Sequence, residues 1–265
     1  MPHELINAWA SFRPGVGPHV LPGDEVLLDP SESRFVIHHR SWRALLGSPD
    51  FGNQDRRLHL SLIPQPFFGN IDSAPVVILS LNPGLKPIDY FGEQFVKPYR
   101  RALVANLRLK LRNSRFPHLF LNPAFSWHSG FTYWHGRFSP LIDAFSRDAG
   151  TCRIEAMSFF SKSIATLELV PYHSASFGLP KHVVSRLRSV KLAREFVQDI
   201  LLPRARASET LIVVVRQSPR WECKKEDSGV IVYQGAETRA AYLGPGSRGG
   251  DAILERLRQI WRDSA

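Results

Sequence analysis

The sequence predicts an α/β fold with three layers (αβα), in which helices cover both faces of a mainly parallel central sheet. Three hydrophobic runs carry this prediction, at residues 75–81, 164–170 and 210–215. The first run does not alternate with polar residues, which is typical of a strand buried on both faces, and the third is the least ambiguous strand in the sequence. Helical patterns separate the runs, and strands that alternate with helices build parallel sheets.

The remaining elements follow from hydrophobic periodicity and from the positions of proline and glycine. Residues 1–65 are irregular and rich in proline, with one short helix expected at 40–46, and we interpret them as an extension that wraps around a single domain formed by residues 1–265. Pro203 is expected to end a helix. The other expected elements are a loop at 85–94, a basic amphipathic helix at 95–112, an aromatic loop-rich region at 116–138, helices at 139–149 and about 180–201, weaker strands at 229–233 and 239–243, and a final amphipathic helix at 249–262.

The charge of the chain points to a polyanionic partner. Lys and Arg number 34 against 24 Asp and Glu, which gives a net charge of +10. Two basic stretches, 97–118 and 181–194, contain no acidic residue. Such stretches favour nucleic-acid binding, here by Arg108, Lys110 and Arg112, although solvated helix faces are the alternative interpretation.

Several classes of function lack their motifs. Cys152 and Cys223 lie far apart without zinc-type spacing, and the ten histidines include no HExxH pair. The patterns GxxxxGK[ST], GxGxxG and GxSxG do not occur, so nucleotide-triphosphate chemistry and a hydrolase triad have no support. The N-terminus lacks a signal pattern, and the apolar runs are too short to span a membrane. We expect a cytoplasmic monomer that uses no metal or cofactor and binds no membrane.

The stretch "PVVILSLNPG" at 75–84 ends a hydrophobic run on Asn-Pro-Gly. Pro83 cannot donate to a strand ladder and Gly84 tolerates unusual backbone angles, so the strand must end in a tight turn. Asn82 is then presented at the carboxyl end of the strand, where ligand crevices form in open α/β sheets. The simpler interpretation is a strand-ending turn with a capping Asn.

Two motifs resemble those of the uracil-DNA glycosylase superfamily, and the resemblance covers roughly residues 65–262. "LSLNPGL" at 79–85 resembles the first active-site motif, most closely that of the mismatch-specific and thymine branch. "YLGPGSRGG" at 242–250 resembles the second motif, a turn that grips the DNA backbone and inserts into the helix, but it lacks the His and the serine run common in relatives.

The resemblance implies a monofunctional DNA glycosylase that flips a base out of double-stranded or single-stranded DNA and leaves an abasic site. It assigns to Asn82 the orientation of a water, because an amide oxygen can accept the hydrogen bond of that water. The turn would contact DNA through Gly246, Ser247 and Arg248. The base pocket would contain Pro83, Gly84, Tyr90, Phe91, Glu168 and His173.

Glu168 bears on the choice of base. In several branches of the superfamily the second strand ends near an Asn that reads a uracil-like edge, and the best-matching position in "TLELVPYHS" is Glu168. A carboxylate accepts but does not donate, so it favours the exocyclic amine of cytosine over the carbonyl of uracil or thymine. Removing ordinary cytosine would be suicidal, which predicts a modified cytosine, such as the glucosylated hydroxymethylcytosine of phage DNA that anti-phage relatives remove.

Other interpretations stay open. Glu168 is equally well explained as a structural partner of a nearby Arg or of His173. A uracil or thymine mismatch repair glycosylase is an alternative function for the chain. A non-catalytic reader of modified DNA needs the pocket without the water, and a hydrolase of free nucleosides needs no extended basic surface.

Overall fold

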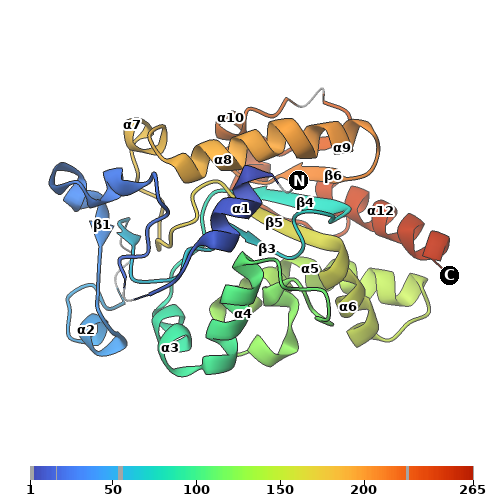
Figure 1. Cartoon of the computed structure of the whole chain (residues 1–265). Helices are drawn as coiled ribbons and strands as arrows, with labels where there is room; N and C mark the ends of the chain where they lie inside the picture. Colours follow the sequence, from blue (N-terminus) through green and yellow to red (C-terminus); the bar gives the residue numbers. More distant parts are fainter. Residues whose placement is uncertain (1–2, 16, 53–55, 225–226, 265) are drawn as a thin grey trace. The chain divides into compact units, whose positions relative to one another are not determined.

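The computed structural model describes residues 3–15, 17–52, 56–224 and 227–264. It shows an α/β protein with a mixed, mostly parallel five-stranded sheet and surrounding helices (Figure 1). The chain forms two compact units. Unit 1 comprises Met1–Phe67, Leu81–Lys110 and Glu168–Phe196, and unit 2 comprises Phe68–Ser80, Leu111–Leu167 and Val197–Ala265.

The sheet has the strand order β3–β5–β4–β6–β7. β4 pairs with β6 in parallel, with Val76 opposite Leu211, and β6 pairs with β7 in parallel. Every residue of β4 and β5 is buried, which explains why these strands are hydrophobic along their length. The three main predicted strands and the weaker one at 229–233 are thus confirmed. The strands are β3 Phe67–Phe68, β4 Val76–Ser80, β5 Ile164–Glu168, β6 Leu211–Val214 and β7 Val230–Val232.

Aromatic packing holds the long helices of unit 2 together. The ring of Phe145 on α5 stacks on Phe159 and meets Phe160 edge-on, both on α6, and Trp261 on α12 contacts Phe145 and Phe159. Figure 1 shows α5 and α6 side by side. The helical elements of this unit are η3 Leu119–Leu121, η4 Pro123–Phe125, α5 Ser129–Asp148, α6 Arg153–Ser163, η5 Val197–Leu201, α9 Leu202–Arg206, α10 Ser218–Trp221, α11 Ala236–Ala240 and α12 Arg248–Ser264.

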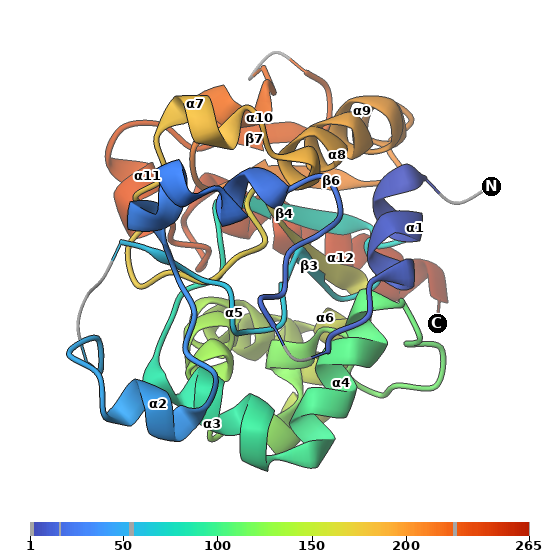
Figure 2. The same cartoon turned by 60° about the vertical axis from the view of Figure 1, so that its left-hand side comes forward.

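Unit 1 contains more regular structure than an irregular extension would. The helix expected around Trp42 is present, but the N-terminal segment also forms helix α1 and a short parallel pair of strands, β1 and β2. Figure 2 shows α1 beside α8, which it contacts. The elements are α1 Glu4–Ser11, η1 Glu25–Leu28, η2 Pro30–Phe35, β1 Val36–Ile37, α2 Trp42–Leu46, β2 Leu58–His59, α3 Pro87–Phe95, α4 Lys97–Leu107, α7 Lys181–Val184 and α8 Arg188–Phe196.

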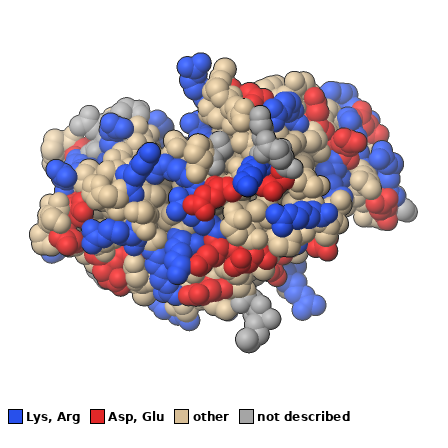
Figure 3. All heavy atoms as spheres, turned by 90° about the horizontal axis from the view of Figure 1, so that it is seen from above, with Lys and Arg blue, Asp and Glu red and all other residues tan. Residues whose placement is uncertain are grey.

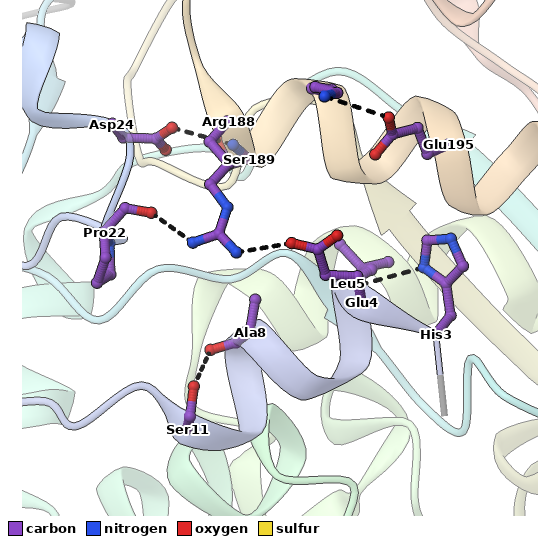
Figure 4. Close-up of polar contacts among 11 residues, drawn as sticks. His3, Glu4, Leu5, Ala8, Ser11, Pro22, Asp24, Arg188, Ser189 and Glu195 are labelled. Atoms are coloured by element: carbon purple, nitrogen blue, oxygen red, sulfur yellow. Dashed lines mark hydrogen bonds and ion pairs between the residues drawn. The ribbon is translucent and has the colours of Figure 1, made fainter. Parts of the chain in front are cut away.

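Polar contacts tie the N-terminal segment to the start of α8 (Figure 4). The Arg188 guanidinium donates to Pro22 O at 2.9 Å and to Glu4 Oε1 at 2.8 Å. The Asp24 carboxylate is fully buried and accepts from the Ser189 backbone N–H at 3.0 Å and from the Tyr172 hydroxyl at 2.5 Å. Burial raises the pKa of Asp24, and the two donated hydrogen bonds oppose that rise. Buried hydrogen bonds therefore hold the N-terminal segment in place.

Three of the expected elements are wrong. The loop expected at 85–94 is helix α3, which begins with Pro87 and whose first turn is capped by Asp89, since its carboxylate accepts from the Lys86 N–H at 2.6 Å. The strand expected at 239–243 is replaced by α11. Pro203 does not end a helix but lies in the first turn of α9. The N–H groups of a first turn have no partner within the helix, so the missing N–H of proline costs no hydrogen bond there.

Other boundaries also moved. The basic helix ends at Leu107 rather than at 112, because Leu109 has a left-handed backbone with φ of 48°. The helix expected at 139–149 begins ten residues earlier, inside the aromatic region, and accommodates Pro140 in its interior. None of the helices in the described part of the chain has the length and hydrophobicity that a bilayer crossing requires.

Asp24→Ala is expected to lower the free energy of unfolding by about 2–4 kcal/mol, because two buried donors, the Tyr172 hydroxyl and the Ser189 N–H, would lose their acceptor. Denaturant unfolding measures the change. Glu25→Ala is the matched control, since this neighbouring carboxylate is exposed and accepts from the nearby Gly23 N–H. An equal, small effect of both substitutions would contradict the assigned role of Asp24.

Candidate functional site

The segments that follow β4 and β5 are hydrogen-bonded to each other within unit 1. Val170 N–H donates to Leu81 O at 2.8 Å, and Ser174 N–H donates to Pro83 O at 3.3 Å. Asn82 therefore lies on a loop whose backbone is held on both sides. This arrangement agrees with the expectation that Asn82 is presented where the strand ends.

The side-chain amide of Asn82 has a fixed orientation. Its Nδ2 donates to Ser174 Oγ at 2.9 Å, to Pro83 O at 2.9 Å and to Tyr172 O at 3.3 Å. Two of these partners are carbonyl oxygens, which can only accept, so the NH₂ group must face them. The opposite atom, Oδ1, is thereby turned away from these partners on a half-buried residue. The result is a hydrogen-bond acceptor whose direction is set by three contacts.

The loop that holds Asn82 is itself anchored. His173 donates from Nδ1 to Gly84 O at 2.8 Å, and the His59 N–H donates to His173 O at 2.8 Å. Tyr172 is buried, and desolvation raises the pKa of its hydroxyl well above the usual range, so it stays protonated and donates to Asp24. These contacts bring together Asn82, Gly84 and His173 from the predicted site.

A pocket opens beside this loop in unit 1. Leu85 follows the Asn82 turn in the chain and Ala175 follows Ser174, and both line the pocket. His59 and Tyr90 also line the pocket, and the Nδ1 atom of His59 is 2.9 Å from the hydroxyl oxygen of Tyr90. Burial raises the pKa of Tyr90, which keeps its hydroxyl protonated.

The structure places the other predicted pocket residues differently. Pro83 is buried in the turn. Phe91 is 38% exposed, and its ring contacts Trp42 and Phe95 at the surface. Glu168 ends β5 with only 3% of its surface exposed, and its backbone N–H donates to Pro66 O at 2.8 Å.

The turn of the second motif lies in unit 2 and is ordered by its own hydrogen bonds. Gly246 has φ of 84°, which favours glycine, and its N–H donates to Asp251 Oδ1 at 2.8 Å. Ser247 Oγ accepts from Gly250 N–H at 3.1 Å and so caps α12. Arg248 donates to Val232 O at 3.1 Å and comes within 4.0 Å of Glu237. Pro245 and Gly246 are exposed at the tip.

The expected basic helix face takes another form. Arg108 is the C-cap of α4, and Lys110 and Arg112 follow the helix rather than lying on it. Lys110 ends a segment of unit 1 and Arg112 belongs to unit 2. Lys and Arg side chains alternate with Asp and Glu side chains on the face shown in Figure 3.

Acidic residues from elsewhere neutralise several cations of the acid-free stretches. Arg115 pairs with Glu155 at 2.7 Å. Arg188 pairs with Glu4 at 2.8 Å, and Arg186 lies 3.7 Å from Glu32. A stretch without acids in sequence is therefore not a surface without acids.

His118, His128 and His135 each make structural contacts. His118 is buried among the rings of Phe68, Trp134 and Phe138, and desolvation lowers its pKa to about 3. His128 accepts from Gly130 N–H at the start of α5, and His135 stacks on a phenylalanine ring. No cluster of three or more His, Cys, Asp or Glu suited to a metal ion occurs among the residues that the structure describes.

Sequence reasoning missed the partners of Asn82. Ser174 is part of "PYHS", a polar loop after a strand, and this signal was sufficient to suggest the loop but not the residue. His59 comes from the segment interpreted as an irregular extension, and nothing in its local sequence marks it. Comparison with family models, with curated proteins and with solved structures finds no match to this chain.

Glu93 on α3 is a buried carboxyl close to the pocket wall. It lies three residues after Tyr90, and both of its oxygens accept from the Ile63 backbone N–H, at 3.1 and 3.0 Å. Desolvation raises the pKa of Glu93 well above its ordinary value of 4.5, and the Ile63 hydrogen bond only partly opposes this.

The pKa of Glu93 sets a pH dependence of stability. The folded chain keeps a proton on Glu93 that the unfolded chain releases. The contribution of Glu93 to the free energy of unfolding is therefore fully present below the ordinary pKa of a glutamate, and it is lost as the pH rises through the pKa of the folded protein. Glu93→Gln keeps an acceptor for Ile63 without the charge. As the pH rises from about 5 through the raised pKa of the folded protein, the wild type should lose stability relative to this variant, by up to about 1.4 kcal/mol per pH unit.

Denaturant unfolding of both proteins across this pH range measures the difference. Glu209→Gln, at a carboxylate whose side chain is 62% exposed, is the control and should run parallel to the wild type. Parallel curves for Glu93→Gln as well would show that Glu93 ionises freely in the folded protein.

Proposed function

We propose that this chain is a monofunctional DNA glycosylase with a three-layer arrangement like that of the uracil-DNA glycosylase superfamily. Its substrate is a flipped modified pyrimidine, best a modified cytosine such as glucosylated hydroxymethylcytosine, and its product is an abasic site. The observation that carries the proposal is the Asn82 amide, whose three donated hydrogen bonds leave Oδ1 as a directed acceptor. The motif around it, Asn-Pro-Gly after a buried strand, is the one that resembles the superfamily.

For hydrolysis of the N-glycosidic bond, the main task of the protein is to position the sugar and the attacking water. The bond from C1′ to the base nitrogen breaks with its electron pair leaving on the base, water adds to C1′, and its surplus proton passes to solvent while the base takes one up. The sugar is cation-like in the transition state, so a water held on the correct face lowers the barrier. Asn82 Oδ1 accepts a hydrogen bond from this water and aims it, without acting as a strong base.

The base must leave the stack to reach such a site. We assign the flipped base to the pocket between His59, Tyr90 and Leu85, which adjoins the Asn82 loop. Two further contacts rest on the resemblance alone: Glu168 accepts from the exocyclic amine of the base, and the turn with Gly246, Ser247 and Arg248 grips DNA. Phosphate contacts by Arg108, Lys110 and Arg112 would be independent of sequence.

Asn82→Ala should abolish base release while leaving DNA binding nearly unchanged. Losing a preorganised group that acts on the transition state costs roughly a hundredfold to a thousandfold in rate. Ser174→Ala, which removes one of the three acceptors that orient the amide, should give an intermediate loss. Single-turnover assays on DNA with modified cytosine, followed by alkali to cleave abasic sites, measure both rates.

Asn113→Ala is the matched control, because Asn113 is an exposed asparagine outside the site. It should leave the rate unchanged. Release by Asn82→Ala within about threefold of wild type would remove Asn82 from the reaction. If the wild-type protein bound modified DNA but released no base, it would instead be a non-catalytic reader of modified DNA.

Glu168→Gln should relax the choice of base, because an amide can rotate to donate as well as accept. A good polar contact to a base edge contributes about 1–3 kcal/mol of discrimination, so the preference for modified cytosine over uracil should fall roughly tenfold to a hundredfold. Relative release of the two bases, measured on one preparation, gives the preference.

Melting temperatures of the same preparations separate the two roles of Glu168. If Glu168 is a structural partner, the Glu168→Gln variant should melt at a lower temperature before its preference for modified cytosine over uracil changes. A wild-type enzyme that removes uracil readily and ignores modified cytosines would overturn the substrate while leaving the role of Asn82 intact.

A further inference from the structure

Unit 1 carries an exposed aromatic cluster on α2, α3 and the segment between α2 and β2. The ring of Trp42 meets Phe51 and Phe91 edge-on, at centroid distances of 5.9 and 6.0 Å, and Phe91 contacts Phe95 at 5.2 Å. Three of these rings face solvent, with 45% of Phe51, 38% of Phe91 and 54% of Phe95 exposed. Large apolar side chains gathered at the surface usually mark a place where something binds.

A groove of about 600 Å³ adjoins this cluster, and Trp42 belongs to both. Its other lining residues include His38, Arg40, Glu93 and Arg100, contributed by the N-terminal segment and by α3 and α4. Trp42 itself packs against the buried cluster of Leu45, Leu62 and Tyr90. Aromatic rings and cations therefore share one surface of the same unit.

The two guanidinium groups that line the groove form no close ion pair. Within the described ranges, the side chains of Arg40 and Arg100 make no hydrogen bond or ion pair, whereas nearby His39 is 3.1 Å from Asp50, a carboxylate that also pairs with Arg57. The acidic side chain that lines the groove, Glu93, is buried and retains its proton more readily than usual.

The titration of His38 reflects the same charge. Partial burial lowers its pKa, and the positive charges of His19, Arg40 and His39 lower it further. Two guanidinium groups without an ion-pair partner make the groove attractive to an anion. Guanidinium groups bind phosphate with good geometry, because they can donate two parallel hydrogen bonds.

We propose that this face of unit 1 binds single-stranded nucleic acid, with backbone phosphates at Arg40 and Arg100 and bases stacked on the exposed rings of the aromatic cluster. The inference rests on the proposed function in taking DNA as the polymer. A positively charged groove beside aromatic side chains is the combination that single strands require, because their bases have free faces. A duplex hides those faces, so stacking on Phe91 and Phe95 selects against it.

Fluorescence anisotropy with an unmodified oligothymidine of about 20 nucleotides, and with a duplex of the same length, tests the proposal on the full chain. The single strand should bind more tightly than the duplex. Arg40→Ala/Arg100→Ala should weaken single-strand binding at least tenfold and reduce the slope of log K against log salt by about 1.4, since each phosphate contact contributes about 0.7. Phe91→Ala/Phe95→Ala should weaken it at least about fivefold with the salt slope unchanged.

Lys162→Ala/Arg262→Ala removes the same charge from exposed positions of unit 2 and should leave binding within about twofold. If the double phenylalanine variant melts early, Phe95→Ala alone replaces it, because Phe95 has the most exposed ring of the cluster. Equal affinity for duplex, or binding unaffected by both double variants, overturns the proposal and leaves the cluster as a protein-docking surface. Because the oligonucleotides carry no excisable base, absence of base release leaves this result untouched, and the two proposals fail separately.

Discussion

The orientation of one amide is the constraint on which the candidate site depends. Asn82 directs its NH₂ group to Pro83 O, Tyr172 O and Ser174 Oγ, and two carbonyl oxygens among three partners forbid the flipped orientation. If the loop after β5 moved away, Oδ1 would lose its direction. Any chemistry that needs a directed acceptor at this position therefore depends on the residues that hold Tyr172 and Ser174 in place.

Those residues lie far from Asn82 in sequence. Tyr172 contributes its carbonyl to Asn82 and its hydroxyl to Asp24, while it also accepts from the Leu21 N–H at 3.1 Å. Asp24 in turn holds the start of α8 through Ser189. The N-terminal segment is thus part of the support for the Asn82 loop.

The sequence was sufficient to predict what local patterns determine. Buried strands show themselves as hydrophobic runs, and Asn-Pro-Gly announces that β4 must end and expose Asn82. Helix α3 was hidden because Pro87 suggests a loop as readily as a first helical turn. The partners of Asn82 were hidden for a different reason: Ser174 lies 92 positions away, and a hydrogen bond across that distance leaves no local trace.

The pairing of charges also depends on contacts between residues that are far apart in the sequence, and this affects which cations can bind a partner. The stretch 181–194 contains no acid in sequence, yet Arg186 and Arg188 meet Glu32 and Glu4 in the folded chain. Arg40 lies outside both acid-free stretches and Arg100 lies within the first of them, 60 positions later, yet both line one groove. A polyanion responds to the field of the folded surface, where paired cations count for little. The cations that are available to a polyanion are therefore those without an acidic partner after folding, and a linear charge cluster need not contain all of them.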